Sequence, residues 1–557
     1  MIDKIIFFSP LTELLIALYV LGYGLLISNF FYNKEEINYN LNEICIFGFC
    51  IILPIIQVTN FFYPITDIFF YISFSLSLFI IFKFKDRIKN FKEWIFKLSL
   101  IFIFFIPFKF VIKGNEDLFY HAPKLELINQ FKIIYGIAHF DPSLSITNGW
   151  SHISSAFNFL NGSLKNLYLS SYVFFVLSIL TFYDYLKKVK LNFLKIFFLI
   201  IITFLLLKFY RLQEFGNDYQ AIILLLFSQS LIFYFYINPD KNEEKQSKLV
   251  NKIIFYSFFA IIFRIYSVFI LPSLIILFIN KEKILKFINK KLLLVLFLTF
   301  LSTSITSLIN SGCFFMPIKQ TCLSKNVVSW SYINKIDELI LHLKTFNTSY
   351  RDYKIKDNGN LTKSEWVKNF NWLNYHLKSE RFLTPFVKTF LMIFILFILI
   401  CYKKNLKFKT LSSKDLLFIF LTSVSFLSWL LYTPLFRAGG YAYWSFLILS
   451  ILLLKSHIQK DLKSKKIKQI LFITISIVIL LNVKRIAHES DKYQTISPFF
   501  FTEWAKFHHM KDGYKEELKS ILLNDPTNKI LSQPSFNKLK SRVNINKINN
   551  NWIISEK

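Results

Sequence analysis

The stretch "LNFLKIFFLIIITFLLL", from Leu191 to Leu207, holds a single lysine and is otherwise almost entirely apolar. A second stretch of the same kind, "LSLIFIFFIPFKFVI", runs from Leu98 to Ile112, and 54% of the 557 residues are hydrophobic. A helix needs roughly 20 apolar residues to cross the hydrocarbon core of a bilayer, and blocks near that length recur along the chain. The sequence therefore predicts an all-α polytopic membrane protein with about 13 or 14 membrane helices.

The net charge is strongly positive, with 66 Lys and Arg against 35 Asp and Glu, or +31. In a soluble protein such a charge would indicate nucleic-acid binding. Here the lysines lie in short clusters between apolar blocks, as they do in the cytoplasmic loops of membrane proteins. We therefore expect no nucleic-acid partner, and we place all the clusters in the cytoplasm. The strongest clusters are residues 83–92, 187–190, 241–248, 281–291, 403–409 and 455–468.

This placement divides the chain into segments. Residues 114–165 (the first external segment) and 312–380 (the second external segment) are expected on the face opposite the lysine clusters. The first apolar stretch lacks a basic leader and a small-residue cleavage site, so we expect a retained helix. The orientation of the first three helices stays open. The predicted units are N-terminal membrane helices (1–91), a membrane core (92–311), the second external segment (312–380), C-terminal membrane helices (381–484) and a polar external tail (485–557).

The apolar run over residues 251–280 is too long for one ordinary span and has basic residues on both sides. A single crossing would put every later loop on the face opposite to the one its charge favours. We therefore predict that the chain turns at Arg264–Ser267, with two half-length helices and with Arg264 near the external surface.

Two of the five cysteines, Cys313 and Cys322, fall in the second external segment. If that segment faces an oxidising compartment, these cysteines could form a disulfide. Their spacing does not decide the matter.

Polar residues gather in "GNEDLFYHAPKLEL", from Gly114 to Leu127, which contains Glu116, Asp117, His121 and Lys124. Proline is tolerated in the first turn of a helix, so we predict an amphipathic helix over 123–135, lying on the membrane surface. A second helix is expected near residue 151. In the simplest structural interpretation Asp117 caps this element and Lys124 extends to the lipid headgroups.

The stretch "DLFYHAPKLELINQFKIIYGIAHFDPSLSITNGWSHISSAF", residues 117–157, resembles bacterial members of the GT-C glycosyltransferase superfamily with a "D-x-x-x-YH" loop. Two further stretches add to this resemblance. "FRIYS" (263–267) is similar to their pair of short helices with a basic residue at the turn, and "NSGCFFMPIKQTCLSKNVVSW" (310–330) is similar to a segment that follows a middle helix.

The resemblance implies a GT-C-like helical bundle in a bacterial inner membrane. It implies transfer of a sugar from a polyprenyl-phosphate-linked donor to a cell-envelope acceptor on the external face. A carboxylate or histidine can take the proton of an acceptor hydroxyl, so Asp117 is the expected catalytic base and His121 the second candidate. The expected substrate-binding residues are Glu116, Lys124, Arg211, Asp218, Arg264 and Arg437, among which the arginines suit a phosphate leaving group.

Other interpretations remain open. Asp117, Asp218 and His121 could hold a divalent metal, although the sequence contains no H-x-x-x-H or C-x-x-C motif. The chain could instead be a lipid-linked glycan polymerase or ligase, a transporter or flippase of lipid-linked or small anionic substrates, or a non-catalytic membrane protein.

Overall fold

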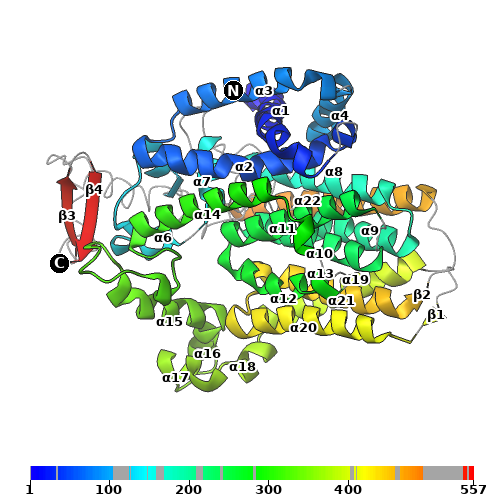
Figure 1. The fold of residues 1–557 in the computed structure, drawn as a ribbon. Coiled ribbons are helices and arrows are strands. Elements are labelled where there is room, and N and C mark those ends of the chain that lie inside the picture. The colour runs from blue at the N-terminus through cyan, green and yellow to red at the C-terminus, as the bar shows by residue number, and fades with distance from the viewer. Residues whose placement is uncertain are drawn as a thin grey trace.

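The computed structural model of the chain describes residues 2–32, 36–88, 90–104, 124–125, 127–146, 148–157, 169–208, 218–238, 242–279, 284–401, 407–408, 410–457, 464–493, 543–548 and 551–556. Within these ranges long helices pack into one bundle, with short helices gathered toward one end of it (Figure 1). The long helices are α1 (Ile2–Ile27), α2 (Leu41–Phe62), α3 (Asp67–Lys83), α4 (Phe91–Phe104), α8 (Leu169–Lys188), α9 (Asn192–Lys208), α10 (Asp218–Ile237), α11 (Glu243–Phe263), α14 (Lys290–Ser311), α19 (Glu380–Cys401), α20 (Ser413–Tyr432), α21 (Tyr441–Lys455) and α22 (Ser464–Tyr493).

Eight of the described helices are long and apolar enough to cross a membrane, and two shorter apolar helices accompany them. Strands in the described ranges are confined to two short antiparallel pairs. These are β1 (Lys407–Phe408) with β2 (Ser456–His457), and β3 (Val543–Ile548) with β4 (Asn551–Glu556). The predicted all-α polytopic membrane protein is confirmed. The count of 13 or 14 spans stays a prediction.

The pattern of exposure on α14 is that of a helix whose outer face meets lipid. Leu294 and Phe297, each 58% exposed, and Leu301 follow one another at helical spacing. On the opposite side the small polar residues Ser302 and Thr306 are buried against the bundle. Small and hydroxyl-bearing residues are common where helices pack in a membrane, because they allow close approach and hydrogen bonding.

Helices α1 and α2 approach each other so closely that two glycines are required. A Cβ atom on Gly48 would lie 1.7 Å from the carbonyl oxygen of Val20, and one on Gly24 would lie 1.8 Å from that of Ile44. The C-terminal half of α1 therefore lies along the first half of α2. Near the end of α1, Arg87 Nη1 donates to Asn29 Oδ1 over 3.0 Å. This contact places the end of α1 on the same side of the bundle as the lysine cluster at 83–92. The orientation of the first helices relative to the membrane stays a prediction.

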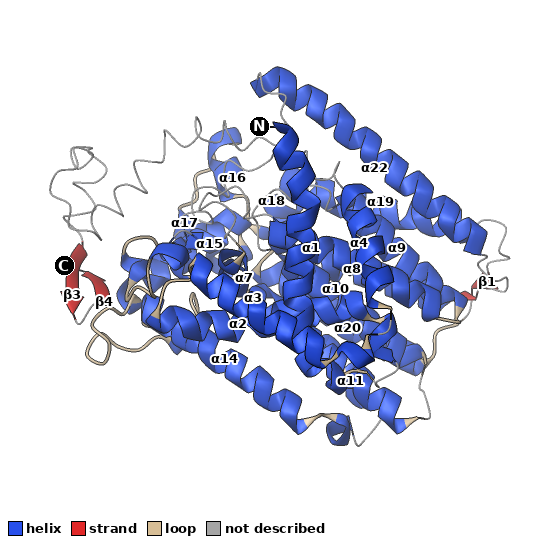
Figure 2. Cartoon of the chain, turned by 90° about the horizontal axis from the view of Figure 1, so that it is seen from above, coloured by secondary structure: helices blue, strands red, loops and turns tan. Residues whose placement is uncertain are grey.

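The first external segment contacts both α14 and the second external segment at one end of the bundle. The amide of Gly136 donates to the carbonyl of Ile309, near the end of α14, over 2.9 Å, and the His139 ring lies 3.1 Å from the carbonyl oxygen of Trp330 in the second external segment. The described part of the tail is also at this end, since β4 contacts η5 (Ile137–His139). In Figure 1 β3 and β4 lie on the left, and β1 and β2, which belong to two of the lysine clusters, lie on the right. In Figure 2, α22 runs along one edge of the bundle.

An impermeant thiol reagent applied to spheroplasts should label cysteines at Gln130 and Val327, one in each external segment. Both positions are exposed to solvent. A cysteine at Lys290, at the start of α14, should react only after permeabilisation, because the lysine clusters are predicted to face the cytoplasm. The experiment uses a background that retains only the two cysteines of the disulfide described below. Labelling at Lys290 without permeabilisation would reverse the topology.

The predicted turn at Arg264 is confirmed. α11 ends at Phe263, and Arg264 has an extended backbone, with φ −151° and ψ 121°. The chain then passes through η7 (Ile265–Ile270), α12 (Leu271–Leu274) and α13 (Ile276–Ile279). It returns to the start of α11, where Ser247 Oγ donates to the carbonyl of Phe287 over 2.7 Å.

The prediction of two half-length helices is wrong for the first helix, α11. α11 has 21 residues, because it begins at Glu243, within the lysine cluster, with the Asn242 side chain as its N-cap. α22 likewise continues beyond the predicted limit at residue 484, to Tyr493.

The second external segment is a folded unit rather than a plain loop. It contains α15 (Ile336–Asn347), α16 (Tyr350–Lys356), α17 (Lys363–Val367) and α18 (Leu373–Lys378). The buried side chain of Trp366 joins them, since its indole Nε1 donates to Thr348 Oγ1 over 2.8 Å. Its ring also lies 4.4 Å from that of Tyr353. Most of these helices are too short for hydrophobic periodicity to predict them from the sequence. Aromatic contacts between them hold the unit together.

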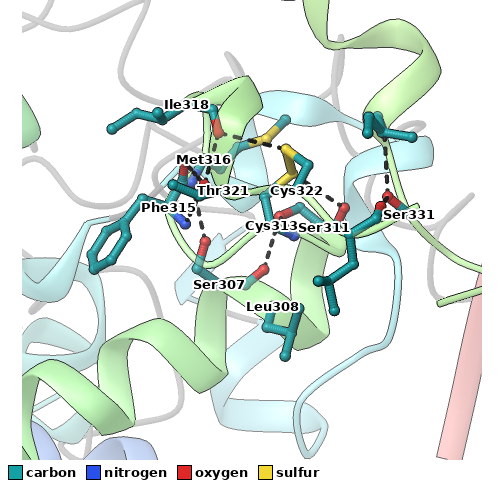
Figure 3. The surroundings of a disulfide bond; sticks show 12 residues. Ser307, Leu308, Ser311, Cys313, Phe315, Met316, Ile318, Thr321, Cys322 and Ser331 are labelled. Atoms are coloured by element: carbon teal, nitrogen blue, oxygen red, sulfur yellow. Dashed lines mark hydrogen bonds between the residues drawn. A yellow bond between two sulfur atoms is a disulfide. The ribbon is translucent and has the colours of Figure 1, made fainter. Parts of the chain in front are cut away.

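The structure settles the question of the cysteine pair, because Cys313 and Cys322 form a disulfide (Figure 3). The bond closes a compact turn directly after α14, and the Met316 amide donates to Ser307 Oγ of that helix over 3.2 Å. Disulfides persist in oxidising compartments. The bond is therefore consistent with an external location of the second external segment.

Candidate functional site

The structure describes half of the eight residues proposed from the sequence. Glu116, Asp117, His121 and Arg211 lie outside the described residues. The other four are Lys124, Asp218, Arg264 and Arg437, and all of them are at the end of the bundle that carries the external segments.

Arg264 and Asp218 form an ion pair between the end of α11 and the start of α10, with 2.8 Å between Nε and Oδ1. Both side chains are largely buried, at 16% and 19% exposure. The Tyr266 hydroxyl donates to the Asp218 carbonyl over 3.2 Å. Asp218 thus does more than begin a helix, because it holds the arginine that ends the neighbouring one.

Lys124 is the second cation of the site. Its side chain is buried, and Nζ donates to the carbonyl of Ile146 over 3.0 Å. Burial lowers the pKa of the Lys124 ammonium to about 7, and the positive charge of Arg264 adds to this effect. An anion that approached both groups would favour the charged form of the lysine.

The prediction that Lys124 belongs to a surface helix over 123–135 is wrong. The described helical residues end at Gln130, and Leu125 and Ile128 are buried in the protein core. The backbone beyond the first turn is bonded to the end of α2 instead, since the Ile133 amide donates to the Asn60 carbonyl over 2.9 Å. These tertiary hydrogen bonds replace the helical ones. Lys124 consequently faces the interior rather than the lipid headgroups.

His152, which the sequence reasoning did not select, completes this side of the site. It lies in α7 (Gly149–Ala156), which begins where Asn148 Oδ1 accepts a hydrogen bond from the Trp150 amide. Burial, followed by the positive charge of Lys124, lowers the pKa of His152 to about 3, so the ring is neutral at pH 7. The only feature of the sequence that pointed to His152 was its position one helical turn after Asn148, a residue type that is favoured as an N-cap.

Lys124 and His152 line a small cavity of about 40 Å³, together with Asn60 and Asn310. A cavity needs roughly 10–15 Å³ to hold one water molecule, so this one has room for a small polar group beside the lysine.

Arg437 lies on η12 (Phe436–Gly440), in the turn between α20 and α21. Its guanidinium is 5.6 Å from the centre of the Phe346 ring, in the second external segment. Gly439 of the same turn has φ +92°, and a Cβ atom there would lie 3.0 Å from the ring of Tyr266. The turn therefore packs on the tyrosine that is bonded to Asp218. Arg437 is linked to the cluster through this turn, and its guanidinium shares the Phe346 ring with that of Arg381.

Arg264 and Asp218 lie at the ends of two membrane helices, and Lys124 lies in the first external segment near the arginine. The desolvation of a charge is costly unless partners stabilise it. Within the described ranges no three His, Cys, Asp or Glu side chains gather to hold a metal ion. Since two of the proposed ligands, Asp117 and His121, lie outside those ranges, a divalent metal stays a prediction.

These observations define a polytopic α-helical membrane protein with a buried charged cluster at one end of its bundle. The chain belongs to the family described as a domain of unknown function, DUF8201, whose model matches residues 6–444. The match extends from α1 into α21 and includes every residue of the candidate site. Comparisons with curated proteins and with solved structures gave no match.

Proposed function

We propose that this protein is an integral-membrane glycosyltransferase. In this proposal it moves a sugar from a polyprenyl-phosphate-linked donor to a cell-envelope acceptor at the external face of a bacterial inner membrane. The observation that carries the proposal is that the buried Lys124 lies near Arg264, whose carboxylate partner is Asp218. The charge of Arg264 disfavours the charged form of Lys124, and a phosphate beside both groups would favour that form and be bound by it.

The chemistry requires few groups. The acceptor hydroxyl attacks the anomeric carbon of the sugar, and the bond between that carbon and the phosphate oxygen breaks. A base takes the hydroxyl proton, and the polyprenyl phosphate leaves with the bonding electrons. In our proposal Asp117 is the base, while Arg264 and Lys124 stabilise the negative charge that develops on the phosphate.

The position of the cluster suits a substrate with a lipid tail. Arg264 and Asp218 lie at the ends of α11 and α10, so a headgroup could reach them from the level of the membrane surface. Lys124 and His152 lie on the first external segment, and α7 of this segment contacts α11. Arg437 and the second external segment are available on the other side of Tyr266 for contacts with the acceptor.

Arg264→Gln should reduce sugar transfer by about 100-fold or more, because loss of one group that stabilises developing charge typically costs this much. The purified protein would be tested with a panel of radiolabelled polyprenyl-phosphate-linked sugars, and transfer measured with a donor that the wild type accepts. Arg351→Gln is the matched control, since Arg351 is an exposed arginine of α16 in the second external segment.

The double variant Asp218→Asn with Arg264→Gln separates two roles of the arginine. It removes the buried pair as a unit, so folding should be preserved. If Arg264 only neutralises Asp218, the double variant will regain activity. If Arg264 binds the donor phosphate, the double variant will stay inactive. Movement of the intact donor across vesicle membranes without sugar transfer would instead support the transporter or flippase interpretation.

A further inference from the structure

A second cavity lies at the opposite end of the bundle, among the lysine clusters. Its volume is about 370 Å³, within the range of roughly 300–1,000 Å³ that is usual for small-molecule sites. It is formed where the ends of α8 and α10 meet the starts of α9 and α11 and the connection between α1 and α2. Its polar lining includes Glu36, Asn40, Lys188, Lys245, Lys248 and Lys252.

One wall of this cavity is fixed by a buried ion pair. Lys252 Nζ lies 2.9 Å from Glu43 Oε2, and the Glu43 side chain is 1% exposed. The Tyr256 hydroxyl donates to the same carboxylate over 2.7 Å, and the Tyr185 hydroxyl donates to it as well. The ammonium of Lys252 also lies 3.8 Å from the centre of the Tyr32 ring. These contacts join α2, α8 and α11, so the shape of the cavity is set before any ligand arrives.

The charged lining is more basic than acidic. Of the side chains that line the cavity, four are lysines and one, Glu36, is acidic. Lys252 is neutralised by Glu43, and Lys248 by Glu244 over 2.7 Å. Lys188 donates to Asn40 over 2.6 Å and lies close enough to Asp184 for their charges to interact, and Lys245 lies in the first turn of α11. The aliphatic and aromatic remainder of the lining includes Phe198 and Leu231.

We propose that this cavity binds a phosphate-bearing anion, which could be the headgroup of a lipid of the cytoplasmic leaflet or a soluble phosphate compound. Lysines bind phosphate as point charges, and basic pockets between membrane helices on the cytoplasmic side suit lipid headgroups. The apolar lining beside the lysines can receive the first carbons of an acyl or prenyl chain.

This site is distinct from the external cluster and does not depend on the transferase proposal. α10 and α11 connect the two sites, with 20 and 21 residues, which corresponds to about 30 Å of helix. Binding at the cytoplasmic end can therefore be measured without any assay of sugar transfer.

The test uses the purified full-length protein in a neutral detergent. Binding of dihexanoyl phosphatidic acid would be compared with that of dihexanoyl phosphatidylcholine and of inorganic pyrophosphate. We expect saturable binding of the phosphatidic acid and a loss of affinity of about tenfold or more in the double variant Lys188→Gln with Lys248→Gln. Lys252 is left intact because its loss would strand Glu43. The matched control, Lys290→Gln with Lys291→Gln, removes two exposed lysines of the same membrane face outside the cavity.

Each possible result of this binding experiment leads to a different conclusion about the ligand. Binding of pyrophosphate with similar affinity identifies a soluble phosphate as the ligand class, whereas binding of the phosphatidic acid alone identifies a lipid headgroup. Equal binding of phosphatidylcholine, or an equal loss in the control variant, would overturn the proposal. If the double variant does not give a monodisperse protein, Leu249→Trp tests the same site by filling the cavity, and unchanged affinity in that variant would also overturn it.

Discussion

Asp117→Asn is expected to produce a folded protein that expresses at the wild-type level and transfers sugar about 100- to 10,000-fold more slowly, since this is the usual contribution of a general base. The substitution keeps the size of the side chain and loses only its ability to accept a proton. Asp117 precedes the buried Lys124 by seven residues in the first external segment. Transfer would be measured with the lipid-linked donor that the wild type accepts, under conditions in which binding is saturated.

The same segment offers a matched control for this experiment. Asp141 is also an aspartate of the first external segment, and its Oδ1 accepts a hydrogen bond from the Ser143 amide over 2.8 Å as the N-cap of α6 (Pro142–Ser145). Asparagine caps helices about as well as aspartate, so Asp141→Asn should leave both folding and transfer nearly unchanged. Wild-type activity in Asp117→Asn would return Asp117 to a capping role and remove the base from the proposed mechanism.

The second large effect concerns stability. Lys252→Met should destabilise the protein by about 3–5 kcal/mol, because it leaves the buried carboxylate of Glu43 without its cation. The Tyr185 and Tyr256 hydroxyls still donate to Glu43, yet they bring no compensating charge. The loss would be measured as the fraction of protein that stays monodisperse in detergent after heating.

A double variant shows whether the unpaired charge of Glu43 causes the loss of stability in Lys252→Met. Glu43→Gln with Lys252→Met removes both charges, and replacing a buried pair as a unit is often close to neutral. The double variant should therefore recover most of the lost stability. If it is as unstable as Lys252→Met alone, the cost arises from the packing of the lysine stem between α2 and α11 rather than from the stranded carboxylate.

The sequence by itself indicated the membrane helices. The predicted limits of the second external segment, 312 and 380, match the end of α14 at Ser311 and the start of α19 at Glu380, since a span is defined by local hydrophobicity. The lysine clusters also predicted the reversal at Arg264, because loop charge is a local property that a single long helix would have violated. The same rule predicts an external position for Asp218 and Arg264, which the structure places together.

Only the tertiary structure decided which charges meet. Glu43 and Lys252 are 209 positions apart, and nothing in the sequence around either residue indicates the other. Lys124 was expected at the lipid surface from its amphipathic neighbours, but hydrogen bonds to the end of α2 turned that segment inward and brought the lysine to Arg264 and His152. Hydrophobic periodicity shows that a face is covered but does not identify the segment that covers it. The partners of a buried charge depend on that segment, because desolvation and pairing are properties of the packed fold.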